Sequence, residues 1–497
     1  MKISIIPAVS AALLVGSACA SDTTVSTYPA LALALSSASN GDTITLMSGT
    51  YTANETINVS AENVTLVSAG GKADTIIDGG SSVQILKVGG GHFTVEGITF
   101  RNAYYAGNGG AISFSSSSVS QTAMIRNCDF IDCTAKYGGA IYAGQNSYSS
   151  FEPRENYGII SGCTFLRCGV ATVGSEGGGG AIFGALWVED SVFDACFCSD
   201  TTKNQYHAAI DVTSYATVTN CIFRNHTQTK RGLVGSKEQR EQQGCSRLVD
   251  CIIANNVGHD QDDVLFHRKV ILDRCVISNN ETTVTSTLAS IYRLDATGDK
   301  SFSRIISCLF IDNKYPFRMD AMPPIVNCTF VRNVGGLVCD NAQSLNFAIT
   351  NCVFWGNVEK TEWPFGNKFK GVPGIYWHPT TPLQDLIKIG TTVVEGGTDN
   401  ADVAAVLAAD ATGESSRLTA LAAQKGPGFK DAAKGDWTLR RSSVLVDVGV
   451  KADWMDSACD IAGNKRCLKR GLVSDGALPD IGCYEFYTIA GFKISFR

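Results

Sequence analysis

A six-residue pattern returns along most of the chain and constrains the fold more than any other feature. It ends in Cys, a variable residue and Phe, with Asn before the Cys, and clear copies occupy 125–130, 218–223, 325–330 and 349–354. The spacing between copies varies, whereas helical repeats keep a fixed length. A constant rung with connections of variable length explains this. The pattern therefore predicts a solenoid of stacked coils.

The Cys-x-Phe spacing indicates a strand whose inward face carries both residues, because side chains two apart lie on the same side of a strand. Asn tolerates the left-handed backbone conformation and suits the turn before that strand. We expect Asn, Cys and Phe to stack once per coil, with coils ~4.8 Å apart. Cysteines in this slot are predicted to be buried free thiols. They are Cys128, Cys163, Cys221, Cys251, Cys275, Cys308, Cys328 and Cys352.

A second pattern, Gly-Gly-Ala-Ile, occurs at 109–112, 138–141 and 179–182, with His-Ala-Ala-Ile at 207–210 as a variant. Two glycines make a tight bend into an inward-facing strand where coils stack closely. The Phe strand often ends in Asn, as at 313, 333 and 357. Together the two patterns resemble the polymorphic outer membrane proteins, which are surface β-helix adhesins. The resemblance covers 93–357 and implies a fold rather than an activity, because every matching residue has a structural role.

The two ends are expected to be caps. An Ala/Leu-rich helix within 29–39 precedes Asn40-Gly41-Asp42 and would cover the first coil. This start is similar to that of pectate-lyase-type proteins. We therefore predict an all-β, right-handed parallel β-helix with an N-terminal helical cap and a C-terminal cap.

The C-terminal region is similar to the choice-of-anchor Q family, whose members place anchoring tails after such a cap. The similarity rests on segments such as Gly435-Asp-Trp-Thr-Leu439, Asp460-Ile-Ala-Gly463 and Asp480-Ile-Gly-Cys-Tyr-Glu485. Only 486–497 follow, too few for a sorting domain or a barrel. Arg466 with the carboxylates of Asp460, Asp480 and Glu485 is interpreted as a structural lock that closes the last coil.

The predicted organisation is a signal peptide (1–20), a β-helix with its N-terminal cap (21–358), a loop and helix insertion (359–425), and the last coil with the C-terminal cap (426–497). The first segment has a basic start, an apolar run and Ala18-Cys19-Ala20 as a cleavage site. Cleavage before Cys19, with lipidation, is the alternative. These features predict a secreted, cell-surface or outer-membrane-associated protein with no transmembrane helix in the mature chain. A net charge of −6 argues against nucleic-acid partners.

The favoured functional interpretation is binding of a glycan or of a surface protein, in the manner of an adhesin. Outward positions on the Gly-Gly-Ala-Ile strands carry Ser113, Tyr142, Phe183 and Asp211. A face that is poor in charge and carries aromatic rings suits sugar stacking or protein contact. Tyr142, Phe183, Asp211 and the nearby His207 are the predicted ligand-binding residues.

The alternative is a calcium-dependent polysaccharide lyase or glycoside hydrolase that acts on uronic-acid polymers. In a lyase Lys230 or Arg231 would be the catalytic base, while Asp211, Asp262 and Asp263 would hold calcium, the one cofactor considered. The common loop signatures of β-helix carbohydrate enzymes are absent, and solvated loop charge explains the same cluster. A structural surface stalk is the third interpretation. The sequence leaves open whether the protein is an enzyme, which ligand it takes, how it is anchored and its oligomeric state.

Overall fold

The computed structural model describes residues 20–115, 123–144, 153–170, 178–184, 186–198, 207–212, 215–227, 232–236, 245–258, 264–268, 270–282, 289–291, 304–314, 317–319, 324–339, 347–359, 369–377, 380–469, 472–473 and 476–487. Cys19 and the rest of the expected signal peptide, apart from Ala20, lie outside these residues. No helix within the described ranges is long and apolar enough to cross a bilayer.

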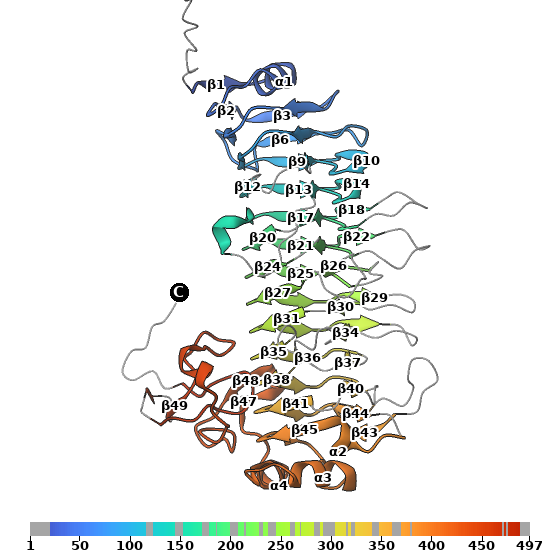
Figure 1. The fold of residues 1–497 in the computed structure, drawn as a ribbon, viewed down its shortest axis with the longest axis vertical. Coiled ribbons are helices and arrows are strands. Elements are labelled where there is room, and N and C mark those ends of the chain that lie inside the picture. Colours follow the sequence, from blue (N-terminus) through green and yellow to red (C-terminus); the bar gives the residue numbers. More distant parts are fainter. Residues whose placement is uncertain are drawn as a thin grey trace, which may run out of the picture.

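The chain forms a right-handed parallel β-helix, as the sequence repeat predicts (Figure 1). Sheet A has 14 strands, from β1 (Asp22–Val25) to β45 (Ile387–Gly390). Sheet B has 13, from β3 (Gly49–Thr52) to β46 (Val393–Val394). Sheet C also has 13, and it runs from β4 (Ile57–Val59) to β44 (Ile375–Trp377), where β43 (Lys370–Val372) adds an antiparallel edge.

One coil illustrates how the repeat folds. β12 (Ala123–Arg126) of sheet A passes through Asn127 and Cys128 into β13 (Asp129–Ile131) of sheet B. Asn127 has φ 49°, and the equivalent Asn220, Asn327 and Asn351 have φ between 51° and 54°. The left-handed conformation expected of the residue before Cys is therefore confirmed.

The interior is built from stacked like residues. Phe100, Phe130, Phe165, Phe193 and Phe223 form a continuous stack with ring centroids 4.8–5.2 Å apart and planes within 6°. The rings lie one coil above another because each strand keeps the same register as its neighbour. Offset parallel rings add to the stabilisation that burial provides.

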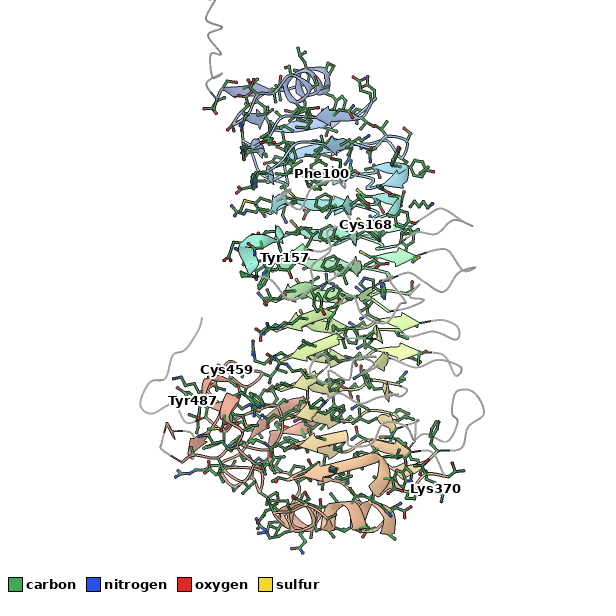
Figure 2. All side chains as sticks on the ribbon, in the orientation of Figure 1. Phe100, Tyr157, Cys168, Lys370, Cys459 and Tyr487 are labelled. Atoms are coloured by element: carbon green, nitrogen blue, oxygen red, sulfur yellow. The ribbon has the colours of Figure 1, made fainter. Side chains whose placement is uncertain are left out.

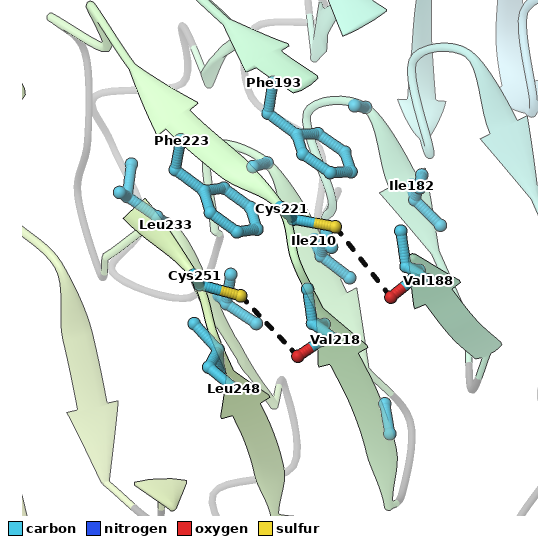
Figure 3. Close-up of a cluster of buried hydrophobic side chains, with 14 of the residues drawn as sticks. Ile182, Val188, Phe193, Ile210, Val218, Cys221, Phe223, Leu233, Leu248 and Cys251 are labelled. Atoms are coloured by element: carbon cyan, nitrogen blue, oxygen red, sulfur yellow. Dashed lines mark hydrogen bonds between the residues drawn. The ribbon is translucent and has the colours of Figure 1, made fainter. Parts of the chain in front are cut away.

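The cysteines of the repeat are buried free thiols, as predicted. In Figure 3, Cys221 donates its S–H to the Val188 carbonyl at 3.8 Å and Cys251 donates to the Val218 carbonyl at 3.6 Å. None of the seventeen described cysteines forms a disulfide, and all but Cys459 are buried. Figure 2 contrasts Cys168, inside the solenoid, with Cys459 on the C-terminal region. A disulfide among Cys459, Cys467 and Cys483 is therefore absent.

The continuous asparagine ladder lies at a different position from the one expected. Before Cys, one Asn-to-Asn bond is recorded among the described residues, from Asn351 to Asn327 at 3.0 Å. The long ladder instead follows the Phe strand, at the Phe-x-x-Asn position. Each amide there donates to the next side-chain carbonyl at 2.8–3.0 Å, through Asn256, Asn280, Asn313, Asn333 and Asn357. The ladder forms here because Asn fills this buried position on five successive coils, whereas the position before Cys is interrupted by residues such as Gly162, Asp190 and Arg274.

Helices cover both ends of the solenoid (Figure 1). α1 (Tyr28–Ser36) begins after Thr27, whose hydroxyl accepts a bond from the Ala30 amide, and it buries Tyr28, Leu31 and Leu35 over the first coil. This confirms the N-terminal helical cap. At the other end α3 (Ala401–Ala408) and α4 (Glu414–Lys425) pack on β45 and β46. The stretch 359–425 thus contains the last coil and its helical cover, instead of an insertion carried on the solenoid.

The region after α4 lies along the side of the solenoid. It contains the hairpin of β47 (Phe429–Asp431) and β48 (Asp436–Leu439), and it packs on apolar outward residues of sheet B. The buried contact includes Leu309, Val331, Val353, Leu445 and Ile481. Figure 1 shows this region beside the final coils. We call 426–487 the lateral cap.

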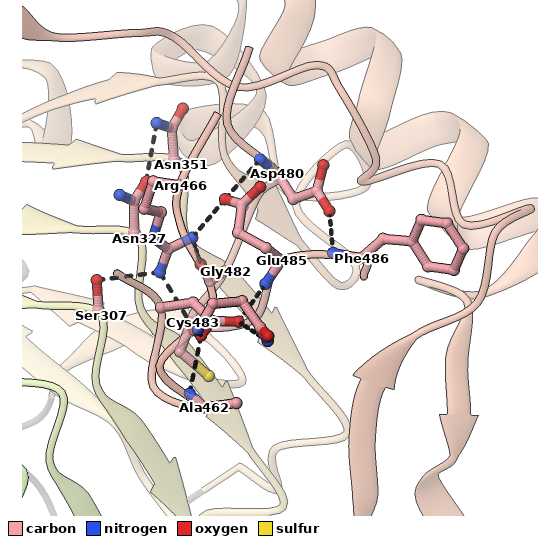
Figure 4. A network of polar contacts seen from close by, with 12 residues as sticks. Ser307, Asn327, Asn351, Ala462, Arg466, Asp480, Gly482, Cys483, Glu485 and Phe486 are labelled. Atoms are coloured by element: carbon pink, nitrogen blue, oxygen red, sulfur yellow. Dashed lines mark hydrogen bonds and ion pairs between the residues drawn. The ribbon is translucent and has the colours of Figure 1, made fainter. Parts of the chain in front are cut away.

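The predicted arginine lock is present within the lateral cap, as Figure 4 shows. Arg466 and Glu485 form an ion pair at 2.9 Å in which neither side chain is exposed. The same guanidinium donates to the Ser307 hydroxyl of the solenoid at 3.0 Å. The lock therefore fastens the cap to earlier coils instead of closing the last one.

Candidate functional site

The connections that vary in length lie on either side of sheet C. The turns between sheets A and B have two residues except for 69–74, whereas the connection after a sheet C strand ranges from 269 alone to the whole of 143–157. These two extremes follow β30 (Phe266–Arg268) and β15 (Ile141–Tyr142). Binding and catalytic residues concentrate on loops that a rigid scaffold positions. We therefore expect a functional site on the outward side of sheet C.

The outward residues of sheet C stand in one column, as the Gly-Gly-Ala-Ile alignment predicts. Strand pairing places Ser113, Tyr142, Phe183, Asp211 and Gly235 on five successive coils. They belong to β11 (Ile112–Phe114), β15, β19 (Ile182–Phe183), β23 (Ile210–Val212) and β26 (Val234–Ser236).

The aromatic part of this column is not an exposed binding face, which corrects the expectation from sequence. Tyr142 is 4% exposed and Phe183 is 2% exposed. Their rings stack with centroids 5.4 Å apart, and Tyr137 meets Phe183 edge-on at 5.1 Å. Burial raises the pKa of the Tyr142 phenol, with a smaller contribution from nearby Tyr137. The three rings pack on one another, which leaves Tyr142 and Phe183 almost no exposed surface for a ligand in this arrangement.

His207 and Asp211 form a buried acid–base pair directly beside these rings. His207 Nδ1 lies 3.5 Å from Asp211 Oδ2, and the side chains are 1% and 0% exposed. Neither ring nitrogen of His207 makes a hydrogen bond within the described part of the chain. A carboxylate next to an imidazole orients the ring and stabilises its protonated form.

Two glycines make room for the pair. A methyl group at Gly178 would lie 2.5 Å from Asp211 Oδ2, and one at Gly235 would overlap the His207 ring. The same methyl group at Gly178 would also touch Phe183. Gly178 therefore lies against both the Phe183 ring and the Asp211 carboxylate. Any side chain at either glycine would displace the acid–base pair. We call His207, Asp211, Phe183, Gly178 and Gly235 the sheet C site.

The backbone at His207 departs from the motif it replaces. Gly109, Gly138 and Gly179 have φ between 59° and 65°, whereas His207 is not among the residues with positive φ. Strand pairing puts Ile210 beside Ile182, so His207 occupies the slot of the first motif glycine. The sequence signal for the site is thus a histidine where the motif has glycine.

The other predicted site residues, Lys230, Arg231, Asp262 and Asp263, lie outside the described residues, so their roles stay predictions. In sequence, Arg231 and Asp263 precede Val234 and Phe266 by the same three positions that separate His207 from Ile210. Within the described ranges no group of three or more His, Cys, Asp or Glu side chains gathers to hold a metal ion. The structure therefore assigns Asp211 to His207 and leaves calcium binding untested.

No protein-family model and no curated protein sequence matches this chain. Several solved structures are similar to it at low identity. A mannuronic-acid-specific family 6 polysaccharide lyase from human gut microbiota is 13% identical, covering 82% of this chain and 98% of its own, with a TM-score of 0.38. The family 6 alginate lyase AlyGC is 12% identical, covering 75% and 51%, with a TM-score of 0.40. The A-module of the Azotobacter vinelandii mannuronan C-5 epimerase AlgE4 is 12% identical, covering 64% and 85%, with a TM-score of 0.20.

Proposed function

We propose that this protein is a polysaccharide lyase that acts on uronic-acid polymers at the sheet C site, with His207 as the proton-transfer group. The observation that carries the proposal is the contact between His207 and Asp211, in a place that two glycines keep open for them. Asp211 would hold the ring and stabilise the imidazolium that forms when His207 takes a proton.

The composition of the site favours elimination over hydrolysis. Glycoside hydrolysis ordinarily uses a pair of carboxylates, whereas Asp211 is the single carboxylate among the described residues that form the sheet C site. In a uronate the C5 hydrogen is acidic because it neighbours a carboxyl group. His207 would take that proton, its electron pair would form the C4–C5 double bond, and the C4–O bond would break. The departing sugar oxygen would then take a proton.

This proposal reverses the preference drawn from the sequence. Adhesin-like binding rested on an exposed aromatic face, and Tyr142 and Phe183 are buried. Binding without cleavage is the second candidate, and the observation that favours it is the burial of His207 itself. For lyase activity, the groups that cover His207 must move when substrate enters.

The test is to incubate the mature protein with alginate, pectate and hyaluronan, with and without calcium, and to record the ultraviolet absorbance of a 4,5-unsaturated uronate. We expect product from at least one polymer. His207→Ala should lower turnover by at least ~100-fold. Asp211→Asn should lower it as well, because the ring loses the charge that stabilises its protonated form.

His226→Asn is the matched control, since it also removes a buried histidine but lies inside the solenoid, and it should retain activity. Arg231→Ala and Lys230→Ala test the base expected from the sequence. The proposal is overturned when folded protein forms no unsaturated product from any polymer, or when His207→Ala cleaves as fast as the wild type. Polymer binding without product would establish the second candidate.

A further inference from the structure

A short fourth sheet lies beside the sheet C site. Sheet D consists of β10 (Tyr104–Asn108), β14 (Thr134–Tyr137), β18 (Gly169–Val170) and β22 (Phe197–Cys198). Its strands pair in parallel on four successive coils, and strand register places Tyr104, Thr134, Gly169 and Phe197 in one column. Tyr104, Thr134 and Phe197 are partly exposed. Two aromatic residues thus stand three strand spacings apart, ~14 Å.

Glycines let two aromatic rings of sheet D lie flat against the backbone. A methyl group at Gly169 would lie 2.5 Å from the Phe197 ring, and one at Gly107 would lie 2.6 Å from the Tyr105 ring. Each ring therefore rests over a glycine instead of standing away from the strand. Tyr105 is 45% exposed, but it lies in the column of Ala135 and faces away from Tyr104, whereas Phe197 is partly exposed on the same side as Tyr104. A flat ring with one exposed face is the arrangement that stacks on the apolar face of a sugar.

The sheet D surface continues into the sheet C site. Tyr137 of β14 contacts the Phe183 ring and forms an isolated β-bridge with Gly178, the glycine beside Asp211. Lys136 Nζ lies 5.4 Å from the centre of the Tyr137 ring and is partly exposed. A positive charge therefore stands at the junction of the two surfaces, where the carboxylates of a uronic-acid polymer would pass.

We propose that the outward side of sheet D, defined by Tyr104, Lys136 and Phe197, holds sugar units of a uronic-acid polysaccharide that extend beyond the sheet C site. The inference rests on the proposed function for the identity of its ligand. The rings supply stacking contacts along a length that accommodates several linked sugars. Lys136 supplies the charge that distinguishes an acidic from a neutral chain.

The experiment measures binding in a background that does not cleave. Affinity electrophoresis of His207→Ala protein in gels containing the polymer is compared with the same protein carrying Tyr104→Ala and Phe197→Ala. Loss of two stacking contacts should weaken retardation by roughly 10-fold. Lys136→Met should weaken binding to an acidic polymer and leave binding to a neutral one unchanged.

Tyr487→Ala is the matched control, because Tyr487 is 53% exposed and lies on the lateral cap, away from sheet D (Figure 2). It should bind like its parent. Thermal unfolding of each variant, and Phe197→Leu as a milder change, separate lost binding from lost folding. Unchanged retardation of the folded double variant overturns the sheet D proposal.

The outcomes also separate this inference from the proposed function. If the wild type cleaves and the double variant keeps an unchanged KM for long polymer, the sheet D proposal is overturned and the lyase proposal stands. Polymer binding that needs the rings, without any unsaturated product, supports sheet D and overturns the lyase. Absence of both cleavage and retardation in folded protein overturns both.

Discussion

At the scale of single residues, cysteine behaves here as a small apolar side chain. Its slot on the inward face of sheet B is lined by strands and by the neighbouring thiols, and its S–H donates to backbone carbonyls of the preceding coil. Burial raises the pKa of the Cys221 thiol to about 12. Such thiols are poor nucleophiles, because only the thiolate reacts.

We therefore predict that alkylating reagents label Cys221 and Cys251 slowly in native protein and rapidly after denaturation. Both are 1% exposed. Labelling is followed by mass spectrometry over time. Cys459, partly exposed, should account for the fast native phase, and Cys459→Ser should remove that phase. Fast native modification of both core thiols would contradict the stacked interior.

His226 is a second residue with a testable consequence. It occupies the ladder position that later coils fill with Asn, and its Nδ1 lies 2.8 Å from Asn256 Oδ1. Burial lowers its pKa to about 4. The unfolded chain takes up a proton below pH ~6.5 while the folded protein does not, so stability is lost as pH falls from there towards 4. The loss amounts to about 3 kcal/mol.

His226→Asn should remove this acid-dependent loss and extend the ladder by one amide. Urea unfolding between pH 7 and pH 4 measures it. Between pH 7 and pH 4 the urea concentration at the midpoint of unfolding should stay nearly constant for the variant and fall for the wild type. Effects of carboxylates are common to both proteins. If the stability of the two proteins depends equally on pH, the His226 side chain is in contact with water and the prediction is wrong.

At the scale of structural elements, the lateral cap is held by a buried charge cluster. Arg466 pairs with Glu485, the carboxyl groups of Asp460 and Asp480 accept from backbone amides beside this pair, and all four residues are at most 3% exposed. Asp460 is compensated by the amides of Ala462, Asn464 and Glu485. Burial raises the pKa of Glu485 to about 7 despite Arg466, and raises that of Asp480 to about 8 with a further contribution from Glu485. Asp447 also raises the pKa of Asp480.

The raised pKa values of Glu485 and Asp480 make the stability of the lateral cap fall as pH rises. The folded cap retains protons that the unfolded chain releases near pH 4, so its stability falls as pH rises from about 4 and this contribution is fully lost above the folded pKa values of about 7 and 8. Glu485→Gln keeps the oxygen that accepts from Arg466 and removes one ionisable group. We expect it to reduce the loss of stability between pH 6 and pH 9.

Denaturant unfolding across that pH range checks the expectation. Glu414→Gln serves as control, because the Glu414 side chain is 35% exposed at the start of α4 and pairs with Arg417. It should follow the wild type at every pH. A Glu485→Gln protein that loses stability on the alkaline side as steeply as the wild type would contradict the assignment of this pH dependence to Glu485.

At the scale of the whole molecule, the solenoid and the lateral cap differ in how far the sequence predicts them. Each coil is specified locally, since the left-handed turn, Cys and Phe lie within a few residues and recur. The cap is held by contacts between residues that are distant in sequence, such as Arg466 with Ser307. No local sequence pattern predicts where the cap packs. Likewise the alignment predicts the column through Phe183 and Asp211, but not that neighbouring rings bury it.

The cap should detach without unfolding the coils when its apolar contact is broken. Ile481 is fully buried against the lateral cap and sheet B, and Ile481→Asp places an unpaired charge there. Hydrogen exchange should rise in 426–487 while β41 (Phe347–Thr350) and β42 (Val353–Trp355) stay protected from inside. Lys434→Glu, on an 83% exposed side chain, should leave exchange unchanged. Global unfolding by Ile481→Asp would show that the last coils depend on the cap.

The direction of the inter-coil hydrogen bonds has a mechanical consequence. These bonds run along the long axis of the rod, so tension applied at its two ends loads the coil interfaces in series, and the weakest interface sets the force at which the rod yields. The lateral cap reinforces the interfaces between the coils that carry Ser307, Thr329 and Asn351, because it is hydrogen-bonded to all three coils. A rod pulled in this way should yield first among the coils before Ser307 and should lengthen one coil at a time.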